Sequence, residues 1–503
     1  MPWSSLRLLP WDSVGRRCDG APGPGARGLP RRMQGAALWA GVLLLGVLWG
    51  CLIAAAGPAA AYLCASGLGA AFILRDFRVG VVLLILLMPI AGSHVFPHTM
   101  LGVTGLNPVN LLLAATLGAC LLQAAAQGGL RGFLPRPLWF YLLPILVAGA
   151  IGAHRVGDIA PAFYMLDMLD FHDAAGYLRD LVVKPLSLVV FALLVCAAAA
   201  RSARPEKFLL PALLSVLAMD AIVVVYVAQS GVALYRLASS ESREFLSALG
   251  MHANDLGRLY AVAYALLLFA WGAEEQPALR VALLAAMGLT AIALMLTFSR
   301  GAFVAFALVN ALFVLRQRGG RALLFAAALA GLALFALPDA VRERATVGFG
   351  GGLDAISAGR LDGLWLPLLP EVLRSPVYGS GIESILWSDP MRVGGGANVL
   401  LVTHPHNAYL RALLDTGVLG LALLGAYYAH AWRRLRECAA DPACAPTLRG
   451  FFRGAAAALV AILVADFTDS SLMPRPEQVF LWFAIGMMYG RLAAVARVAG
   501  RRR

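Results

Sequence analysis

The segment LVVKPLSLVVFALLVCAAAARSARPEK (residues 181–207) contains the two features that decide the fold of this chain. Its apolar part carries a single charge, Lys184, and is long enough to cross about 30 Å of hydrocarbon as a helix. The basic residues that follow are typical of a cytoplasmic loop, and a second apolar run begins at residue 208. The segment therefore predicts membrane helices joined on the cytoplasmic side.

The same pattern recurs along the whole chain. Of its 503 residues, 60% are hydrophobic and 14% are charged, and the mean hydropathy is +0.77. A soluble domain would carry about 25% charged residues. We therefore predict an all-α polytopic membrane protein with about 12 to 14 transmembrane helices. The apolar runs begin near residues 36, 58, 79, 108, 137, 181, 208, 256, 279, 301, 321, 407, 453 and 477.

Charge and cysteine content exclude some other classes. The net charge of +13 comes from arginines scattered between apolar runs, so it does not predict a nucleic-acid partner. Four of the seven cysteines lie inside apolar runs. Cys438 and Cys444 share a short arginine-rich loop, with no histidine near enough to complete a zinc site. We expect no disulfide framework, no metal and no cofactor.

Loop composition divides the chain into four parts. Residues 1–35, rich in proline, glycine and arginine, predict a disordered, basic, cytoplasmic N-terminus. A transmembrane region follows at 36–338, then one large periplasmic loop at 339–405, then C-terminal transmembrane helices at 406–496. With the N-terminus in the cytoplasm, the basic loops fall inside and the long polar loops fall outside. Both termini are then cytoplasmic.

The junction HPHNAYLRALLDTGVLG (404–420) places two histidines where the large loop meets an apolar helix. On spacing alone, a histidine at a helix start is more often structural than catalytic. At the water–lipid boundary, however, the imidazole of His406 is suited to act as a general base. Asn407 is suited to hold that ring or to cap the helix. His404 lies across Pro405, so we expect the two rings to diverge and not to form a paired metal site.

Two arginines run against the orientation rule. Arg300 lies at a membrane-depth turn, where a charge suggests function, although snorkelling to the headgroups is an alternative. Arg360 lies in SAGRLDGLWLPLLPEVLRSP (357–376), whose leucines recur at the spacing of a short amphipathic helix. On one membrane face with His406, these arginines suit a phosphate-bearing lipid, because guanidinium pairs with phosphate through two parallel hydrogen bonds.

Three weaker patterns remain. Asp170, His172 and Asp173 could hold a divalent metal, but a solvated loop is the default interpretation. HANDLGRLYAVAYALLL (252–268) opens a span for which Asn254 is a candidate cap. Asp220 is the clear mid-span charge, a position typical of transporters.

Several of these stretches together resemble one family. HPHNAYLRALLDTGVLGLALL (404–424) is similar to the His-Asn-x-Tyr-Leu…Glu-x-Gly-x-x-Gly signature of the O-antigen ligase and polysaccharide polymerase superfamily. LTFSRGAFVAFAL (296–308) looks like its Ser-Arg-Gly span junction. AGRLDGLWLPLLPEVLRSPVYGSGIES (358–384) looks like its loop pattern of Arg, Trp and Pro-x-x-Gly-x-Gly. The resemblance places an O-antigen ligase-related core at about residues 250–485.

The resemblance implies a metal-independent, inverting glycosyltransferase of the bacterial inner membrane with a periplasmic active face. It would move an oligo- or polysaccharide from undecaprenyl diphosphate to a glycan or lipid A–core acceptor hydroxyl. His406 matches the proposed catalytic histidine, and Arg300 and Arg360 match arginines that engage the diphosphate. Asn407, Tyr409 and Asp415 are supporting residues, with Asp415 standing where the family more often has Glu.

Two questions stay open at the level of sequence. Ligase, polymerase and protein O-glycosylation activities share this donor chemistry, so the motifs do not separate them. A lipid-linked glycan flippase or transporter without transferase chemistry is the rival class, and Asp220 is its best support. Such a transporter predicts two similar halves, but the sequence shows no internal repeat.

Overall fold

The computed structural model describes residues 46–51, 53–55, 58–91, 96, 99–100, 103–104, 107–126, 134–231, 245–247, 249–316, 350–392, 401–468 and 471–501, with 324, 327, 331 and 339. The N-terminus predicted at 1–35 lies outside these residues. So do most of the span expected near residue 36 and most of the one expected near 321.

In the described part, secondary structure is helical except for one antiparallel pair, β1 (Thr99–Met100) and β2 (Val103–Thr104). The long helices are α2 (Pro58–Arg75), α3 (Phe77–Leu87), α4 (Pro108–Ala126), α5 (Trp139–His154), α8 (Lys184–Arg201), α9 (Leu209–Ser230), α11 (Ala253–Ala273), α12 (Pro277–Leu296), α13 (Arg300–Arg316), α19 (Ala408–Ala440), α20 (Pro446–Ala465) and α21 (Val479–Arg501). Short α-helices are α6 (Pro161–Met165), α7 (Ala174–Leu178), α16 (Gly352–Ser357), α17 (Leu366–Arg374) and α18 (Asp389–Arg392). The 3-10 turns are η1 (Met88–Ile90), η2 (Arg136–Leu138), η3 (Val156–Asp158), η5 (Pro205–Phe208), η8 (Ser384–Trp387), η9 (Asp466–Thr468) and η10 (Pro476–Gln478), and the π-helices are η4 (Arg179–Val183) and η7 (Leu361–Trp365).

Nine helical stretches among the described residues are long and apolar enough to cross a membrane. All nine coincide with apolar runs identified in the sequence, beginning with Pro108–Ala126 and ending with Pro476–Arg497. The helix α13, expected as a further span, has 17 residues, and residues 317–323 after it lie outside the described ranges. The prediction of an all-helical, multi-pass membrane protein is therefore confirmed, with nine of the expected 12 to 14 spans seen as long helices.

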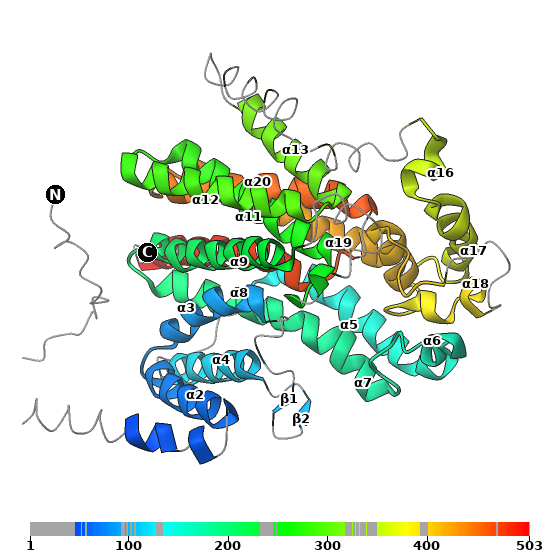
Figure 1. Ribbon diagram of the computed structural model, residues 1–503, viewed down its shortest axis with the longest axis horizontal. Coiled ribbons are helices and arrows are strands. Elements are labelled where there is room, and N and C mark those ends of the chain that lie inside the picture. The colour runs from blue at the N-terminus through cyan, green and yellow to red at the C-terminus, as the bar shows by residue number, and fades with distance from the viewer. Residues whose placement is uncertain are drawn as a thin grey trace, which may run out of the picture. The chain divides into compact units, whose positions relative to one another are not determined.

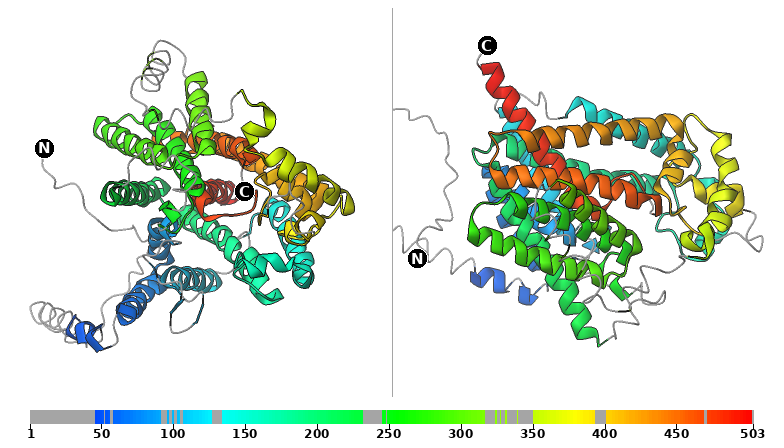
Figure 2. Two further views of the ribbon diagram at one scale, coloured as in Figure 1. Left: turned by 45° about the vertical axis from the view of Figure 1, so that its right-hand side comes forward. Right: turned by 90° about the horizontal axis from the view of Figure 1, so that it is seen from above.

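The spanning helices run side by side, and the large loop lies at one end of them. In Figure 1, α9, α11, α12 and α20 are nearly parallel, with α16, α17 and α18 at their right-hand end. Figure 2 shows α19 and α20 running alongside each other toward the same loop helices. The C-terminus lies at the opposite end of these helices from α16–α18 (Figure 1).

Small residues allow two of the helix pairs to pack at backbone distance. A Cβ added to Gly450 of α20 would lie 2.4 Å from the backbone oxygen of Phe269 in α11. A Cβ added to Gly454 would lie 2.5 Å from the backbone oxygen of Ala265, so α20 and α11 are too close for a side chain at either glycine. In α21, Gly486 approaches α8 equally closely, with 2.5 Å to the Ala192 oxygen. Glycines four residues apart are a known device for close helix packing in lipid, where no hydrophobic force drives helices together.

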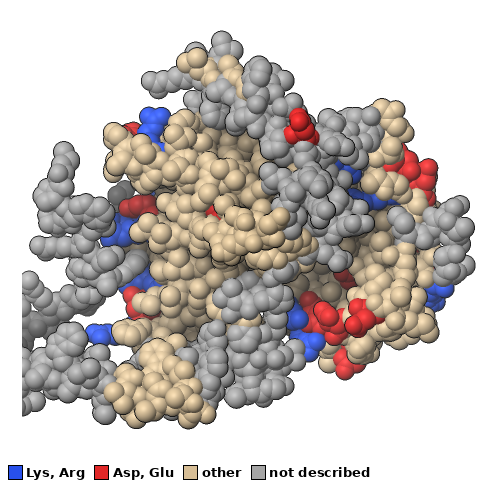
Figure 3. All heavy atoms as spheres, in the orientation of Figure 1, with Lys and Arg blue, Asp and Glu red and all other residues tan. Residues whose placement is uncertain are grey.

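Charged side chains lie mainly near the ends of the helices. In Figure 3, Lys, Arg, Asp and Glu lie mainly at the left and right ends of the view, and the face between them is mostly uncharged. An uncharged belt with charged ends is what a bilayer requires, because a charge at its centre is costly. The distribution fits a membrane-embedded bundle.

The amphipathic helix predicted in the large loop forms in two pieces, η7 and α17. Leu364 and Leu368 are fully buried and Val372 is nearly so, at a spacing of four residues. Leu369, which the pattern also assigned to the apolar face, is 49% exposed. Leu369 follows Leu368 directly in α17 and is turned about 100° from it around the helix axis, so it lies off the buried line and faces outward.

Candidate functional site

The His-Pro-His-Asn junction forms the start of α19. The Asn407 side-chain oxygen accepts hydrogen bonds from the backbone N–H groups of Tyr409 (3.1 Å) and Leu410 (3.0 Å). Asn407 is therefore the N-cap of the helix, one of the two roles open to it in the sequence. His406 precedes it in the left-handed backbone region, at φ +51°. Such a conformation is strained for a histidine, and strain of this kind clusters at functional sites.

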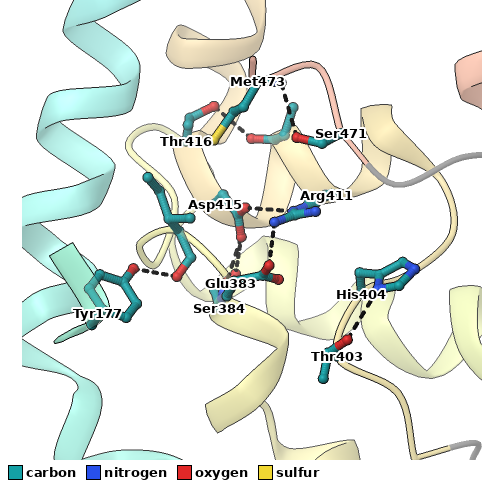
Figure 4. A network of polar contacts seen from close by, with 12 residues as sticks. Tyr177, Glu383, Ser384, Thr403, His404, Arg411, Asp415, Thr416, Ser471 and Met473 are labelled. Carbon is teal, nitrogen blue, oxygen red and sulfur yellow. Dashed lines mark hydrogen bonds and ion pairs between the residues drawn. The ribbon is translucent and has the colours of Figure 1, made fainter. Parts of the chain in front are cut away.

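The expectation that the two histidine rings diverge is wrong. Their ring centroids lie 4.2 Å apart with an interplanar angle of 63°, an edge contact. The left-handed turn at His406 folds the chain back across Pro405, which the two-residue spacing alone did not reveal. A ring nitrogen of His404 lies 3.1 Å from the Thr403 hydroxyl (Figure 4).

A compact turn positions Arg360 beside these histidines. Ala358 and Gly359 both adopt left-handed backbone angles after α16. The Ser357 hydroxyl then accepts the N–H groups of Arg360 (3.1 Å) and Leu361 (3.0 Å), which starts η7. At the end of η7, the Trp365 indole N–H donates to the Pro405 carbonyl at 2.8 Å. This bond ties the segment carrying Arg360 to the segment carrying both histidines.

Thr468, the last residue of η9, connects the predicted site segments. The Arg360 guanidinium donates to the Thr468 carbonyl at 3.4 Å. A Cβ on Gly301, the residue after Arg300, would lie 3.6 Å from the Thr468 hydroxyl. The Tyr409 ring packs on Phe467 with centroids 4.6 Å apart. The two arginine-bearing segments and the start of α19 therefore meet at one place.

The tight turn before Arg300 is held against α11. Ser299 is buried, and its hydroxyl accepts the Ala302 N–H at 3.4 Å at the start of α13. Gly257 of α11 leaves room for this turn, since a Cβ there would lie 2.7 Å from Ala302 Cβ. Close packing of α11 thus fixes the position of Arg300.

The start of α11 differs from the prediction. The helix begins at Ala253, and its N-cap is His252, whose ring nitrogen accepts the Asn254 N–H at 3.2 Å. Asn254 is inside the helix, so the expectation that it caps the span is wrong. His252 takes the cap position because its ring nitrogen, and not the Asn254 side chain, bonds to a free N–H of the first turn.

The structure contains buried charges that the residue patterns did not predict. Arg258 of α11 is 5% exposed and pairs with Glu477, itself 4% exposed, at 3.0 Å. Arg258 also pairs with Asp255, and the Asp466 side chain is buried nearby. An arginine inside the apolar run 256–273 was a visible signal. Its partner was not, because Glu477 lies far away in the sequence.

A second buried network surrounds Asp415 (Figure 4). The Asp415 carboxylate accepts the Ser384 N–H at 3.0 Å and the Ser384 hydroxyl at 2.9 Å. Arg411 lies between Asp415 and Glu383 and pairs with both. Asp415 is 1% exposed, so it holds the loop segment 382–384 against α19 and does not face solvent.

The loop and α19 interlock at two glycines. Gly417 breaks the helix, with φ +67° and ψ −174°. The break frees backbone groups of α19, which bond with the loop: the Val418 N–H donates to the Pro376 oxygen (2.8 Å), and the Leu414 oxygen accepts the Ser380 N–H (2.8 Å). A Cβ on Gly379 or on Gly417 would lie 2.3 Å from the facing backbone. Only glycine fits either position.

Both histidines of the junction are neutral at pH 7. Burial is the main cause that lowers the pKa of His406 from 6.5 to about 4, and the charges of Arg360, His252 and Arg475 lower it further. Burial is also the main cause that lowers the pKa of His404 to about 2, and repulsion by protonated His406 and by the charges of Arg411, Arg475 and Arg360 lowers it further. A neutral imidazole carries the lone pair that a general base needs.

Two other sequence candidates lie apart from this site. No group of three or more His, Cys, Asp or Glu side chains that could hold a metal ion occurs among the described residues, the segment of Asp170, His172 and Asp173 included. Asp220 is fully buried in α9 and accepts the Thr290 hydroxyl at 2.7 Å. This bond to α12 gives the mid-span carboxyl a structural partner.

These features define a multi-pass membrane protein with a histidine–arginine site at one end of its helix bundle. Residues 285–425 match the protein-family model described as O-antigen ligase, so this part of the chain is an O-antigen ligase domain. The match lies inside the core expected at 250–485 and contains all six predicted site residues. Such a domain implies glycan ligase or polymerase activity on lipid-linked glycans. A search of curated proteins found no match.

Proposed function

We propose that this protein is an inverting glycosyltransferase that moves an oligo- or polysaccharide from undecaprenyl diphosphate to an acceptor hydroxyl. It works at the periplasmic face of a bacterial inner membrane, with both termini in the cytoplasm. The observation that carries the proposal is the meeting of the Arg300 turn and Arg360 at Thr468, with a neutral His406 close to Arg360. This is the arrangement that an O-antigen ligase domain needs for a diphosphate leaving group.

The reaction has a simple proton and bond balance. His406 takes the proton of the acceptor hydroxyl, whose oxygen attacks the anomeric carbon. The bond from that carbon to the diphosphate oxygen breaks on the opposite face, which inverts the anomeric configuration. Arg300 and Arg360 stabilise the negative charge that develops on the departing undecaprenyl diphosphate, so no metal ion is required.

The arginines also couple donor binding to the strength of the base. In the free protein, the positive charge of Arg360 contributes to the low pKa of His406. A bound diphosphate would neutralise that charge, so the pKa of His406 rises toward its ordinary value of about 6.5. His406 is then a stronger base when the donor is present than when it is absent.

This coupling predicts the pH dependence of transfer. A base must be unprotonated, so kcat/KM should be constant from pH 8 down to about 5 and fall as the pH drops through about 4. Arg360→Gln removes a nearby positive charge and should move this acid limb to higher pH. Arg360→Lys keeps the charge and serves as the control. The pH profile of kcat/KM in proteoliposomes measures this, and an unshifted limb in Arg360→Gln would contradict the coupling.

Reconstitution tests the function itself. The purified chain in liposomes, supplied with undecaprenyl diphosphate-linked glycan from the source organism, should release undecaprenyl diphosphate and form an inverted glycosidic bond. EDTA should leave the rate unchanged. Lipid A–core, a second lipid-linked repeat and an acceptor protein are offered in separate reactions, and the one that becomes glycosylated identifies ligase, polymerase or protein-modifying activity. Movement of the donor across the bilayer without product in any reaction would support the flippase or transporter instead.

A further inference from the structure

A cavity with both polar and apolar walls lies outside the site just described. It has a volume of about 410 Å³ and lies between the end of α5, the helix α17 and the loop segment 375–387. Its lining does not include His406, Arg300 or Arg360. The volume falls in the range of about 300–1,000 Å³ that is usual for small-molecule sites. The proposed mechanism leaves this cavity without a role.

The walls of the cavity combine aromatic rings with charged groups. Tyr378 and Trp387 contribute rings, and Arg155, Arg374 and Glu371 contribute charges. Arg155 lies over the Trp387 ring, 5.8 Å from its centroid. Arg374 pairs with Glu371 at 3.1 Å and with Asp389, so the charges are already fixed in place.

This chemistry suits a sugar ring better than other parts of the substrates. The apolar face of a pyranose can pack on an aromatic ring, while its hydroxyl groups bond to guanidinium and carboxylate groups with spare capacity. An acyl chain would strip water from three charged side chains without replacing their hydrogen bonds. A bare diphosphate would face the Glu371 carboxylate.

The cavity is also connected to the histidines. Ser384 and Leu414 line its inner wall, and Ser384 bonds to Asp415. Asp415 pairs with Arg411, whose charge contributes to the low pKa of His404. The network of Ser384, Asp415 and Arg411, drawn with His404 in Figure 4, therefore links a wall of the cavity to the histidine junction.

We propose that this cavity is a glycan subsite that binds a sugar unit of the donor or acceptor chain away from the reacting carbon. The proposal rests on the proposed function for the identity of the glycan. The subsite would hold the chain in a fixed direction while its reacting end lies at His406. It would therefore contribute to the choice of sugar through binding and leave the chemical step to the histidine.

Binding of free oligosaccharides tests the subsite without catalysis. The full chain in nanodiscs is titrated with two probes, followed by saturation-transfer NMR. One probe is the repeat-unit oligosaccharide released by mild acid from the lipid-linked donor, and the other is the deacylated core oligosaccharide of the acceptor lipopolysaccharide. Tyr378→Ala should weaken the binding of one probe about 10-fold, since loss of an aromatic contact in a pocket typically costs more than about 1 kcal/mol of binding free energy. Ser380→Trp should fill the cavity and abolish binding.

The controls distinguish a failure of the subsite proposal from a failure of the proposed transferase function. Tyr378 is 61% exposed, so its truncation does not disturb the fold. Tyr164→Ala is a matched truncation at a tyrosine that does not line the cavity, and it should bind as the native chain does. Binding of the repeat unit assigns the subsite to the donor, and binding of the core assigns it to the acceptor. If neither probe binds, or if Ser380→Trp binds as well as the native chain, the subsite is overturned. Absence of transfer despite normal binding would overturn the function alone.

Discussion

Alanine in place of His406 is expected to lower glycan transfer by about 10²–10⁴-fold, the range that a general base contributes. The imidazole is neutral at pH 7, since its pKa is lowered to about 4, and it lies beside the arginine that bonds to Thr468. Alanine keeps the cap of α19, because Asn407 makes those bonds. The rate of transfer in proteoliposomes, normalised to inserted protein, measures the effect.

The matched control for this change is His172→Ala. His172 lies in the segment 169–180, is exposed, and contacts the Tyr164 ring outside the proposed site. The His172→Ala substitution removes the same kind of side chain and should leave the rate of transfer within about 2-fold of the native rate, as usual for a surface substitution. Full transfer by His406→Ala would show that another group takes the acceptor proton.

Alanine in place of Gly417 is expected to lower transfer strongly by a different route. The residue has φ +67° and ψ −174°, a region open essentially to glycine alone, so a side chain there costs about 1–3 kcal/mol in strain. Its Cβ would also lie 2.3 Å from the Val377 oxygen. The loop segment 376–381 must then separate from α19, and Ser384 loses its fixed position against Asp415.

Two measurements in membranes test whether the loop segment separates from α19. Limited proteolysis should cut the segment 376–387 faster in Gly417→Ala, and transfer should fall about 10²-fold, as expected for a site displaced by 1 Å. Gly425→Ala is the control, because it changes a glycine of the same helix with nothing within 4 Å of the new Cβ. Native cleavage and native transfer in Gly417→Ala would mean that the interlock does not position the site.

The sequence was most informative about features that depend on neighbouring residues. Each of the nine long apolar helices coincides with a run recognised from hydropathy, since crossing hydrocarbon requires a continuous apolar segment. Arg300, Arg360 and His406 stood out because charged or titratable groups are rare at a membrane boundary. The structure brings the segments that carry them together at Thr468 and Pro405.

Residue patterns predicted less well which side chain makes a given contact at a helix start. Asn254 has the composition of a cap, but His252 holds that position. The two-residue spacing of His404 and His406 suggested separate rings, but the left-handed turn places them in contact. Backbone angles of this kind are set by the surrounding loop, so they are not visible in residue spacing.

The sequence by itself determined an all-helical membrane protein and the residue types of its site, because both follow from the cost of placing polar groups in hydrocarbon. Only the tertiary structure decided which distant residues meet. It paired Arg258 with Glu477, and it fitted Gly379 and Gly417 together between the loop and α19. Such contacts join segments far apart in the chain, and close packing in three dimensions, which no local pattern encodes, selects them.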